Sequence, residues 1–147
     1  VKKVEEHVAD AVGKGAKVLF GGERVNGPGT FYVPTVLTGV KTDMLAMREE
    51  TFGPVAPLMK FESDDEVIRH ANSTEFGLAS YFYSRDIQRV WRVAEALESG
   101  IVGINEGIVS TEVAPFGGVK ESGIGREGSK YGLDEYLEIK YLCFGGI

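Results

Sequence analysis

Residues 78–105 read LASYFYSRDIQRVWRVAEALESGIVGIN and place one amphipathic segment between two apolar ones. Leu78–Tyr83 and Ile101–Asn105 are short, apolar and bounded by turn residues, which is typical of strands. Asp86 stands where a helix N-cap belongs, and Gly100 stands where a C′ glycine is expected. The apolar residues between them recur at helical spacing: Ile87, Val90, Trp91, Ala94 and Leu97. The stretch therefore predicts a strand, a helix and a second, parallel strand.

The preceding residues add one more strand and one more helix to this pattern. Val55–Phe61 is apolar and strand-like, and Ser63-Asp64-Asp65-Glu66 has the spacing of a capping box at the start of a helix. The order β-α-β-α-β with short connections is typical of an α/β fold. We therefore expect a parallel sheet covered by helices over this part of the chain.

The N-terminal third predicts a further helix and two further strands. Apolar residues at helical spacing indicate a helix over residues 1–12, and Ala16–Phe20 reads as a short strand. Phe31–Leu37 is extended around Pro34, and a proline inside a strand favours an edge or bulged position.

Composition limits the function classes. The chain has 147 residues, 43% apolar and 26% charged, which suits a single domain with one hydrophobic core. The net charge of −6 argues against a general nucleic-acid surface, and no apolar run approaches the ~20 residues that span a membrane. The sequence begins directly on a helical pattern without Met or a targeting segment. We therefore expect a piece of a longer protein.

The cysteine and the histidines do not predict a metal site or a nucleophile. Cys143 lies between hydrophobes in Glu138–Phe144, which reads as a terminal strand, so a small buried hydrophobe is expected there. Such an apolar strand needs a partner, either within the fold or on another subunit. His7 and His70 lack neighbouring ligand patterns and are interpreted as surface helix residues.

Pro115–Gly128, PFGGVKESGIGREG, contains Gly123-x-Gly125-x-x-Gly128, the spacing of a dinucleotide-binding fingerprint. That fingerprint needs a strand directly before its first glycine and an acidic residue about 20 positions further on. Here the preceding strand ends at Asn105, and the chain ends before the acidic position. The spacing is therefore interpreted as accidental.

Glu49 and Glu50 precede Thr51-Phe52-Gly53-Pro54 in a constrained turn at the entrance of a core strand. A solvated acidic turn is one interpretation. In the other, one carboxylate accepts hydrogen bonds from two sugar hydroxyls, and Phe52 offers an apolar ring face. Spacing alone does not choose between these two.

Three ordered motifs nevertheless resemble the aldehyde dehydrogenase superfamily. They are Glu49–Val55 (EETFGPV), Ala71–Ala79 (ANSTEFGLA) and Pro115–Glu127 (PFGGVKESGIGRE). Within the superfamily, Asn105–Ser110 and Gly128–Tyr136 resemble succinate-semialdehyde dehydrogenases, with glutarate-semialdehyde dehydrogenases as close relatives.

The resemblance implies a role for each matching residue. Glu50 corresponds to the glutamate that holds the nicotinamide-ribose hydroxyls, and Phe52 to an aromatic ring at the same end of the cofactor. Ser110 corresponds to a serine that hydrogen-bonds the distal carboxylate of the substrate, and Phe116 to an aromatic residue of the aldehyde tunnel. Glu127 corresponds to a glutamate of a candidate proton relay.

The same resemblance implies that essential parts lie upstream. These are the nucleophilic cysteine, the general base, the substrate-clamping arginines and the Rossmann domain that binds most of NAD or NADP. We therefore expect residues 1–137 to be the C-terminal half of a catalytic domain, and 138–147 to be a strand for subunit assembly. The chain alone is expected to be inactive, and the parent to be a homo-oligomeric enzyme of the cytoplasm or mitochondrial matrix. The parent is expected to oxidise a small aldehyde, succinate semialdehyde, to succinate. No metal, nucleic acid or membrane partner is expected. One alternative is a dehydrogenase of glutarate semialdehyde or of another aldehyde, and the other is a binding module that pairs through its terminal strand.

Overall fold

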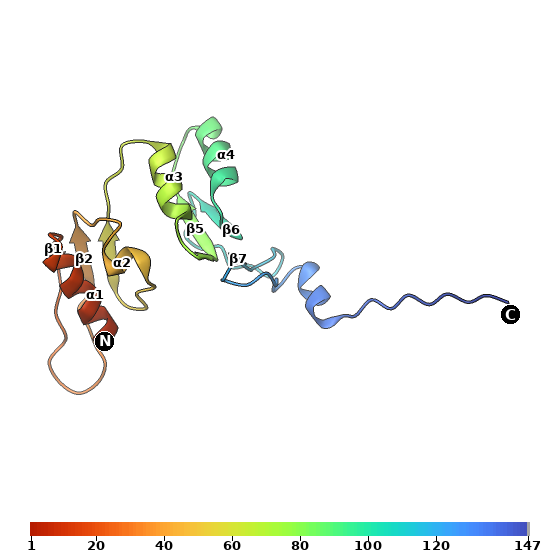
Figure 1. Cartoon of the computed structure of the whole chain (residues 1–147), viewed down its shortest axis with the longest axis horizontal. Helices are drawn as coiled ribbons and strands as arrows, with labels where there is room; N and C mark the ends of the chain where they lie inside the picture. Colours follow the sequence, from red (N-terminus) through yellow and green to blue (C-terminus); the bar gives the residue numbers. More distant parts are fainter. Residues whose placement is uncertain (147) are drawn as a thin grey trace. The chain divides into compact units, whose positions relative to one another are not determined.

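A computed structural model describes residues 1–146 of the chain. The chain divides into two compact units, Val1–Ser63 and Asp64–Ile147. Figure 1 colours the first unit from red to yellow and the second from green to blue. Among the described residues, no helix has both the length and the apolar character needed to cross a lipid bilayer.

The first unit contains a helix packed on a three-stranded sheet. Its elements are α1 (Lys2–Gly13), β1 (Lys17–Phe20), β2 (Thr35–Thr38), α2 (Leu45–Arg48) and β3 (Val55–Leu58) (Figure 1). The strand order is β1-β2-β3, with β1 antiparallel and β3 parallel to β2. Val4, Val8 and Ala11 share one face of α1, and that face joins Leu37 and Met44 in one buried cluster.

The edge position expected for the strand around Pro34 is wrong. β2 is the central strand of its sheet, and it begins at Thr35, directly after the proline. Proline is tolerated before the first ladder position because it is not required to donate there. Thr35 supplies the first donor, from its amide nitrogen to the carbonyl oxygen of Pro54 at 2.8 Å. The irregular register lies instead opposite β2, between Val18 and Phe20 of β1.

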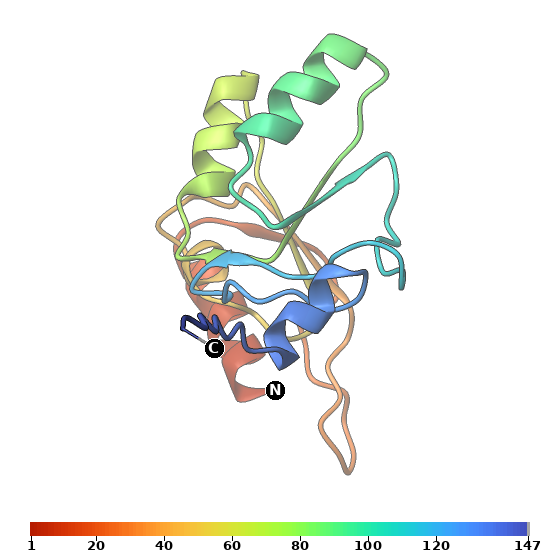
Figure 2. The same cartoon turned by 90° about the vertical axis from the view of Figure 1, so that its right-hand side faces the viewer.

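The second unit contains two helices and two short two-stranded sheets. Its elements are α3 (Asp64–Asn72), β4 (Phe76–Gly77), β5 (Ala79–Phe82), α4 (Ile87–Ala96), β6 (Ile101–Ile104), β7 (Val119–Lys120) and the 3₁₀ helix η1 (Tyr131–Tyr136). β5 and β6 are parallel, whereas β4 and β7 are antiparallel. Figures 1 and 2 both show α3 and α4 side by side.

The strand, helix and parallel strand predicted over residues 78–105 are confirmed. β5 and β6 pair in register from Ala79 opposite Ile101 to Phe82 opposite Ile104. The carboxylate of Asp86 accepts hydrogen bonds from the amides of Gln88 and Arg89, at 2.9 and 3.3 Å, so it is the N-cap of α4.

One continuous β-α-β-α-β sheet is not formed. β3 pairs with β2, and β5 pairs with β6, so β3 and β5 belong to different sheets. The α/β class and the parallel pairing hold, but the sequence pattern gives the type of each element and not its partner.

Gly100 does not cap α4. The helix ends at Ala96, and its C-cap is Leu97. Gly100 is required for a different reason, because a Cβ atom there would overlap the carbonyl oxygen of Gly117. The residue therefore permits close backbone approach rather than a left-handed turn.

The terminal strand predicted over Glu138–Phe144 is not formed among the described residues, where η1 is the last element. The 3₁₀ helix η1 lies just before this segment. Cys143 is exposed, so its expected burial is also wrong. Extended chain becomes a strand only when another strand satisfies its backbone groups, and no described residue does so here.

Candidate functional site

Glu50 and Phe52 lie on the turn between α2 and β3, and both are exposed. The Phe52 side chain is 91% exposed. Within the described part of the chain, the Glu50 carboxylate has no hydrogen bond or ion pair. A free carboxylate beside an accessible ring can accept hydroxyl hydrogen bonds and stack on a flat group. The two residues can therefore contact a ligand that carries hydroxyl groups and a flat ring.

Sequence reasoning missed His7, which was expected at the surface but is only 1% exposed. Its Nδ1 shares a hydrogen bond of 2.6 Å with Oγ1 of Thr51. Its Nε2 lies 3.6 Å from Oε2 of Glu49, which also pairs with Nζ of Lys3 at 3.3 Å. The helix pattern around His7 carries no signal for this, because the partners lie more than forty residues away. His70 is half-buried, with Nε2 3.8 Å from Oε1 of Glu66.

Phe116 and Glu127 lie directly opposite each other in the glycine-rich segment. The amide of Phe116 donates to the carbonyl of Glu127 at 2.9 Å, and the amide of Glu127 donates back at 2.7 Å. In such an antiparallel pair both side chains leave the same face of the ladder. We name the Pro115–Gly128 segment, which this pair closes, the glycine hairpin.

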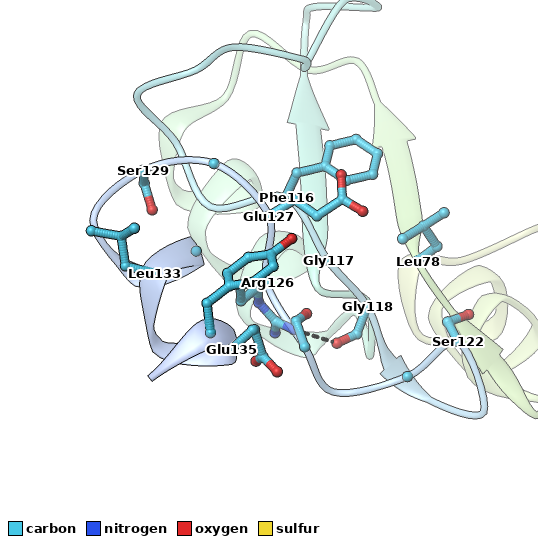
Figure 3. A pocket seen from close by; sticks show the side chains of 15 residues that line it. Leu78, Phe116, Gly117, Gly118, Ser122, Arg126, Glu127, Ser129, Leu133 and Glu135 are labelled. Carbon is cyan, nitrogen blue, oxygen red and sulfur yellow. Dashed lines mark hydrogen bonds between the residues drawn. The ribbon is translucent and has the colours of Figure 1, made fainter. Parts of the chain in front are cut away.

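Arg126 fixes the inside of the glycine hairpin. Its Nη1 donates to three main-chain carbonyls, those of Gly118 at 2.7 Å, Gly125 at 2.9 Å and Ile124 at 3.1 Å. Figure 3 shows this side chain in the middle of a pocket, with a dashed line to Gly118. The guanidinium is here a scaffold for the backbone.

Lys120 attaches the glycine hairpin to the ends of two helices. Its ammonium group donates to the carbonyls of Asn72 at 2.8 Å and Thr74 at 3.1 Å, and it pairs with Glu98 at 2.5 Å. A cation at the C-terminal carbonyl of α3 is favourably placed for the helix dipole. Lys120 also has a positive φ of 55°, which is uncommon outside glycine.

Asn72 joins the two helices to each other. Its Nδ2 donates to the carbonyl of Ala96 at 2.8 Å, and its Oδ1 accepts from the amide of Glu98 at 2.9 Å. We name Asn72, Glu98 and Lys120 the polar clasp. The second and third motifs of the sequence therefore meet through side-chain and main-chain hydrogen bonds.

Ser110, Phe116 and Glu127 share one pocket of about 470 Å³. Its remaining lining residues are Thr111, Glu112 and Gly128. The loop that carries Ser110 is shaped by Glu106, whose carboxylate accepts from the amides of Gly107 and Ile108 at 2.8 and 3.0 Å. These amide hydrogen bonds, that of Ile108 first, lower the pKa of Glu106 below its ordinary value.

A second pocket, of about 660 Å³, is also lined by Phe116 and Glu127 and reaches η1. Figure 3 shows Phe116 and Glu127 together, with Leu78 and Ser122 on one side and Leu133 and Glu135 of η1 on the other. The structure thus brings three of the five candidate residues together in the second unit. Glu50 and Phe52 belong to the first unit.

Cys143 is absent from both pockets. Among residues 1–146, no group of three or more His, Cys, Asp or Glu residues is arranged to hold a metal ion. The arrangement can bind and orient a polar organic molecule, and no cysteine among the described residues lines either pocket.

Residues 1–142 match the model of the aldehyde dehydrogenase family. The chain is 63% identical over 147 residues to glutarate-semialdehyde dehydrogenase of Pseudomonas aeruginosa, covering all of this chain and 30% of that protein. It is 61% identical over the same length to 3-sulfolactaldehyde dehydrogenase of Pseudomonas putida, with the same coverage.

Among solved structures, the crystal structure of succinate-semialdehyde dehydrogenase from Burkholderia pseudomallei superposes with a TM-score of 0.94 at 66% identity. The match covers 97% of this chain and 30% of that one. This chain thus spans about 30% of the length of the relatives that it matches. The match along nearly the whole sequence shows that the chain belongs to the aldehyde dehydrogenase family.

Proposed function

We propose that this chain is part of an NAD- or NADP-dependent dehydrogenase that oxidises succinate semialdehyde to succinate. The observation that carries the proposal is the pocket shared by Ser110, Phe116 and Glu127. Its aromatic wall suits an aldehyde chain, and its serine hydroxyl can donate to an anionic group at the far end. The reaction consumes one water and one oxidised cofactor, and it releases the carboxylate, the reduced cofactor and two protons.

The substrate class is a short aldehyde with an anion at the opposite end. The relatives named above act, by their names, on succinate semialdehyde, glutarate semialdehyde and 3-sulfolactaldehyde. These three aldehydes share a terminal carboxylate or sulfonate. A serine donor suits either anion, so glutarate semialdehyde remains the second candidate substrate. The positive charge that the anion also needs comes, by the resemblance, from arginines outside this chain.

The cofactor contacts of this chain are assigned to Glu50 and Phe52. The free Glu50 carboxylate would accept hydrogen bonds from the two ribose hydroxyls, and the Phe52 ring would contact the nicotinamide end. When bound, the nicotinamide accepts the hydride of the aldehyde carbon. The task of these two residues is to fix the orientation of the ring that receives it.

Glu127 is assigned to a proton relay beside the aldehyde. It shares the pocket with Ser110 and is fixed at its backbone by Phe116. Its carboxylate can accept a proton from water during release of the acid product. Glu127→Gln keeps the shape and removes the basic group, so kcat should fall while the KM for the aldehyde stays unchanged. An unchanged kcat would remove Glu127 from the mechanism.

The substrate proposal is tested in the full-length dehydrogenase by following formation of the reduced cofactor. Ser110→Ala should raise the KM for succinate semialdehyde about 10-fold, the scale of one hydrogen bond to a charged group. Butanal is the neutral control, and its KM should not change. Equal losses with both aldehydes would contradict anion recognition by Ser110. The purified 147-residue chain should give no turnover with either cofactor.

The terminal segment is assigned to assembly of a homo-oligomer. Its backbone has no strand partner among the described residues. Its apolar side chains are exposed, and they are Ile139, Tyr141, Leu142 and Phe144. An unpaired apolar segment favours pairing with another chain. Deletion of residues 138–147 should lower the number of subunits in the oligomer, as measured by light scattering. An unchanged number of subunits would exclude this role.

A further inference from the structure

The buried imidazole of His7 is not explained by the proposed chemistry, although it lies directly beneath the turn that presents Glu50 and Phe52. A buried polar ring requires partners, and those that His7 has belong to this turn. The question is therefore what the imidazole does for the turn.

The turn contacts α1 at every second residue. Glu49 pairs with Lys3, Thr51 shares the hydrogen bond with His7, and Gly53 lies so close to Val4 that a Cβ atom would overlap the valine side chain. Lys3, Val4 and His7 are related by steps of three and four residues, so they lie on one face of the helix.

The alternate residues of the turn face away from the helix. Glu50 and Phe52 are exposed, in contrast to half-buried Thr51 between them. The backbone is extended at Glu49, and the amide of Gly53 donates to the carbonyl of Thr51 at 2.8 Å, which places Phe52 at the centre of a three-residue turn. Holding Thr51 toward α1 therefore fixes the outward direction of Glu50 and Phe52.

The hydrogen bond between His7 and Thr51 is the directional contact in this set. At 2.6 Å it is short, and the imidazole has almost no exposure. The ion pair between Glu49 and Lys3 lies at the surface, with both side chains about half exposed, so it contributes little to stability. The contact between Gly53 and Val4 limits how closely the turn approaches α1, but it does not set the orientation of the turn.

We infer that His7 is a positioning residue for the nicotinamide cofactor, acting through Thr51 to orient Glu50 and Phe52. This inference rests on the proposed cofactor role of the turn. It assigns to the first helix an indirect part in cofactor affinity, because the buried His7 acts through Thr51.

The test measures cofactor affinity in the full-length dehydrogenase by isothermal titration calorimetry with NAD⁺ and NADP⁺. Thr51→Val keeps the shape of the side chain and removes the hydroxyl. It should weaken cofactor binding about 5- to 10-fold, the scale of one lost hydrogen bond. Thr51→Ser retains the hydroxyl and should restore wild-type affinity. The KM for the aldehyde should not change in either variant.

His7→Leu should weaken cofactor binding as much as Thr51→Val, and the double variant no further, because both changes remove the same bond. His70→Leu is the matched control, since His70 is half-buried and lies on α3. If His7→Leu does not fold, the comparison of Thr51→Val with Thr51→Ser decides the matter alone.

Unchanged affinity in Thr51→Val overturns the inference, as does equal weakening by Thr51→Ser. Failure of the proposed function gives a different result. If the wild-type enzyme binds a cofactor but oxidises no aldehyde with a terminal anion, the substrate proposal fails while the affinity measurements still judge His7. If it binds neither cofactor, both fail.

Discussion

The Glu49–Pro54 turn and the glycine hairpin each present candidate site residues, but their supports differ. The turn lies on a helix whose other side chains fill the buried cluster of the first unit. The glycine hairpin is held by main-chain pairs, by Arg126 and by the polar clasp. Among the described residues of the second unit, Val93 is the buried hydrophobic side chain.

This difference determines which substitutions destabilise each region. Where side chains fill a core, stability is lost when a side chain is shortened. Where backbones approach closely and charges bind carbonyls, stability is lost when an atom is added or a charge is removed. Substitutions in the two regions and acidification can separate these two modes.

Leu37→Ala should cause the largest loss, about 2–5 kcal/mol of unfolding free energy, because it leaves a cavity in the core of the first unit. Leu37 is 0% exposed. Urea denaturation measures the total loss, and amide hydrogen exchange locates it. Exchange should accelerate in α1 and β2 and stay unchanged in β5 and β6. Equal acceleration of amide hydrogen exchange in both units would show that the two units do not unfold independently.

Gly100→Ala should cost about 1–3 kcal/mol, the usual range for overpacking, since the new methyl group meets backbone and not a flexible side chain. The obstacle is the carbonyl oxygen of Gly117. Gly107→Ala is the control, because the nearest atom to its new methyl group is the Tyr83 hydroxyl at 3.9 Å. In Gly100→Ala, amide hydrogen exchange should accelerate in β6 and in the glycine hairpin. A loss no greater than that of the control would refute the close approach.

Gly100 also shows what the sequence could and could not predict. Periodicity and the Asp86 cap correctly place α4, β5 and β6, because these signals are local. The glycine after the helix looks like a C′ residue. A glycine is needed there, however, because the backbone of a residue more than fifteen positions further along the chain leaves no room for a Cβ atom. Local pattern cannot distinguish a glycine that turns from a glycine that makes room.

The candidate site divides in the same way. Family resemblance predicts Ser110, Phe116 and Glu127, and the structure places these three around one pocket. Their roles stay predictions. His7 could not be found by local reasoning, since its partners Thr51 and Glu49 lie more than forty positions further along the sequence. Its importance depends on which loop folds against that helix.

Lys120→Met should cost about 1–2 kcal/mol, because hydrogen bonds to charged groups are lost while the aliphatic stem is kept. The loss leaves the carbonyls of Asn72 and Thr74 and the Glu98 carboxylate without their cation. Lys41→Met, at an exposed lysine, is the control. Urea denaturation should show a lower midpoint for Lys120→Met alone. A midpoint equal to that of the control would mean that main-chain pairing holds the glycine hairpin without the polar clasp.

Acidification should have the smallest effect, and in the second unit it should act through Asp64. Arg89, by its hydrogen bond, and Arg92 lower the pKa of Asp64 below its ordinary value of 3.8. A lowered pKa in the folded state means that the ionised form stabilises the fold. That contribution is complete above the ordinary value and disappears as the pH falls through the folded pKa.

Asp10 of the first unit also has a lowered pKa, mainly through its hydrogen bond from Lys14, so both units lose a carboxylate interaction in acid. The first unit keeps its buried apolar cluster, whereas the ion pairs of Asp64 are direct polar links between α3 and α4. Trp91 lies on α4 and is the single tryptophan of the sequence, so its fluorescence reports on this helix. The urea midpoint of this fluorescence should fall as the pH is lowered below the ordinary pKa of Asp64. Asp64→Asn should reduce this pH dependence to the part that comes from Glu106, whose pKa is also lowered, while Asp65→Asn on the same helix should leave it unchanged. A midpoint that follows pH equally in Asp64→Asn would assign the acid sensitivity to another carboxylate.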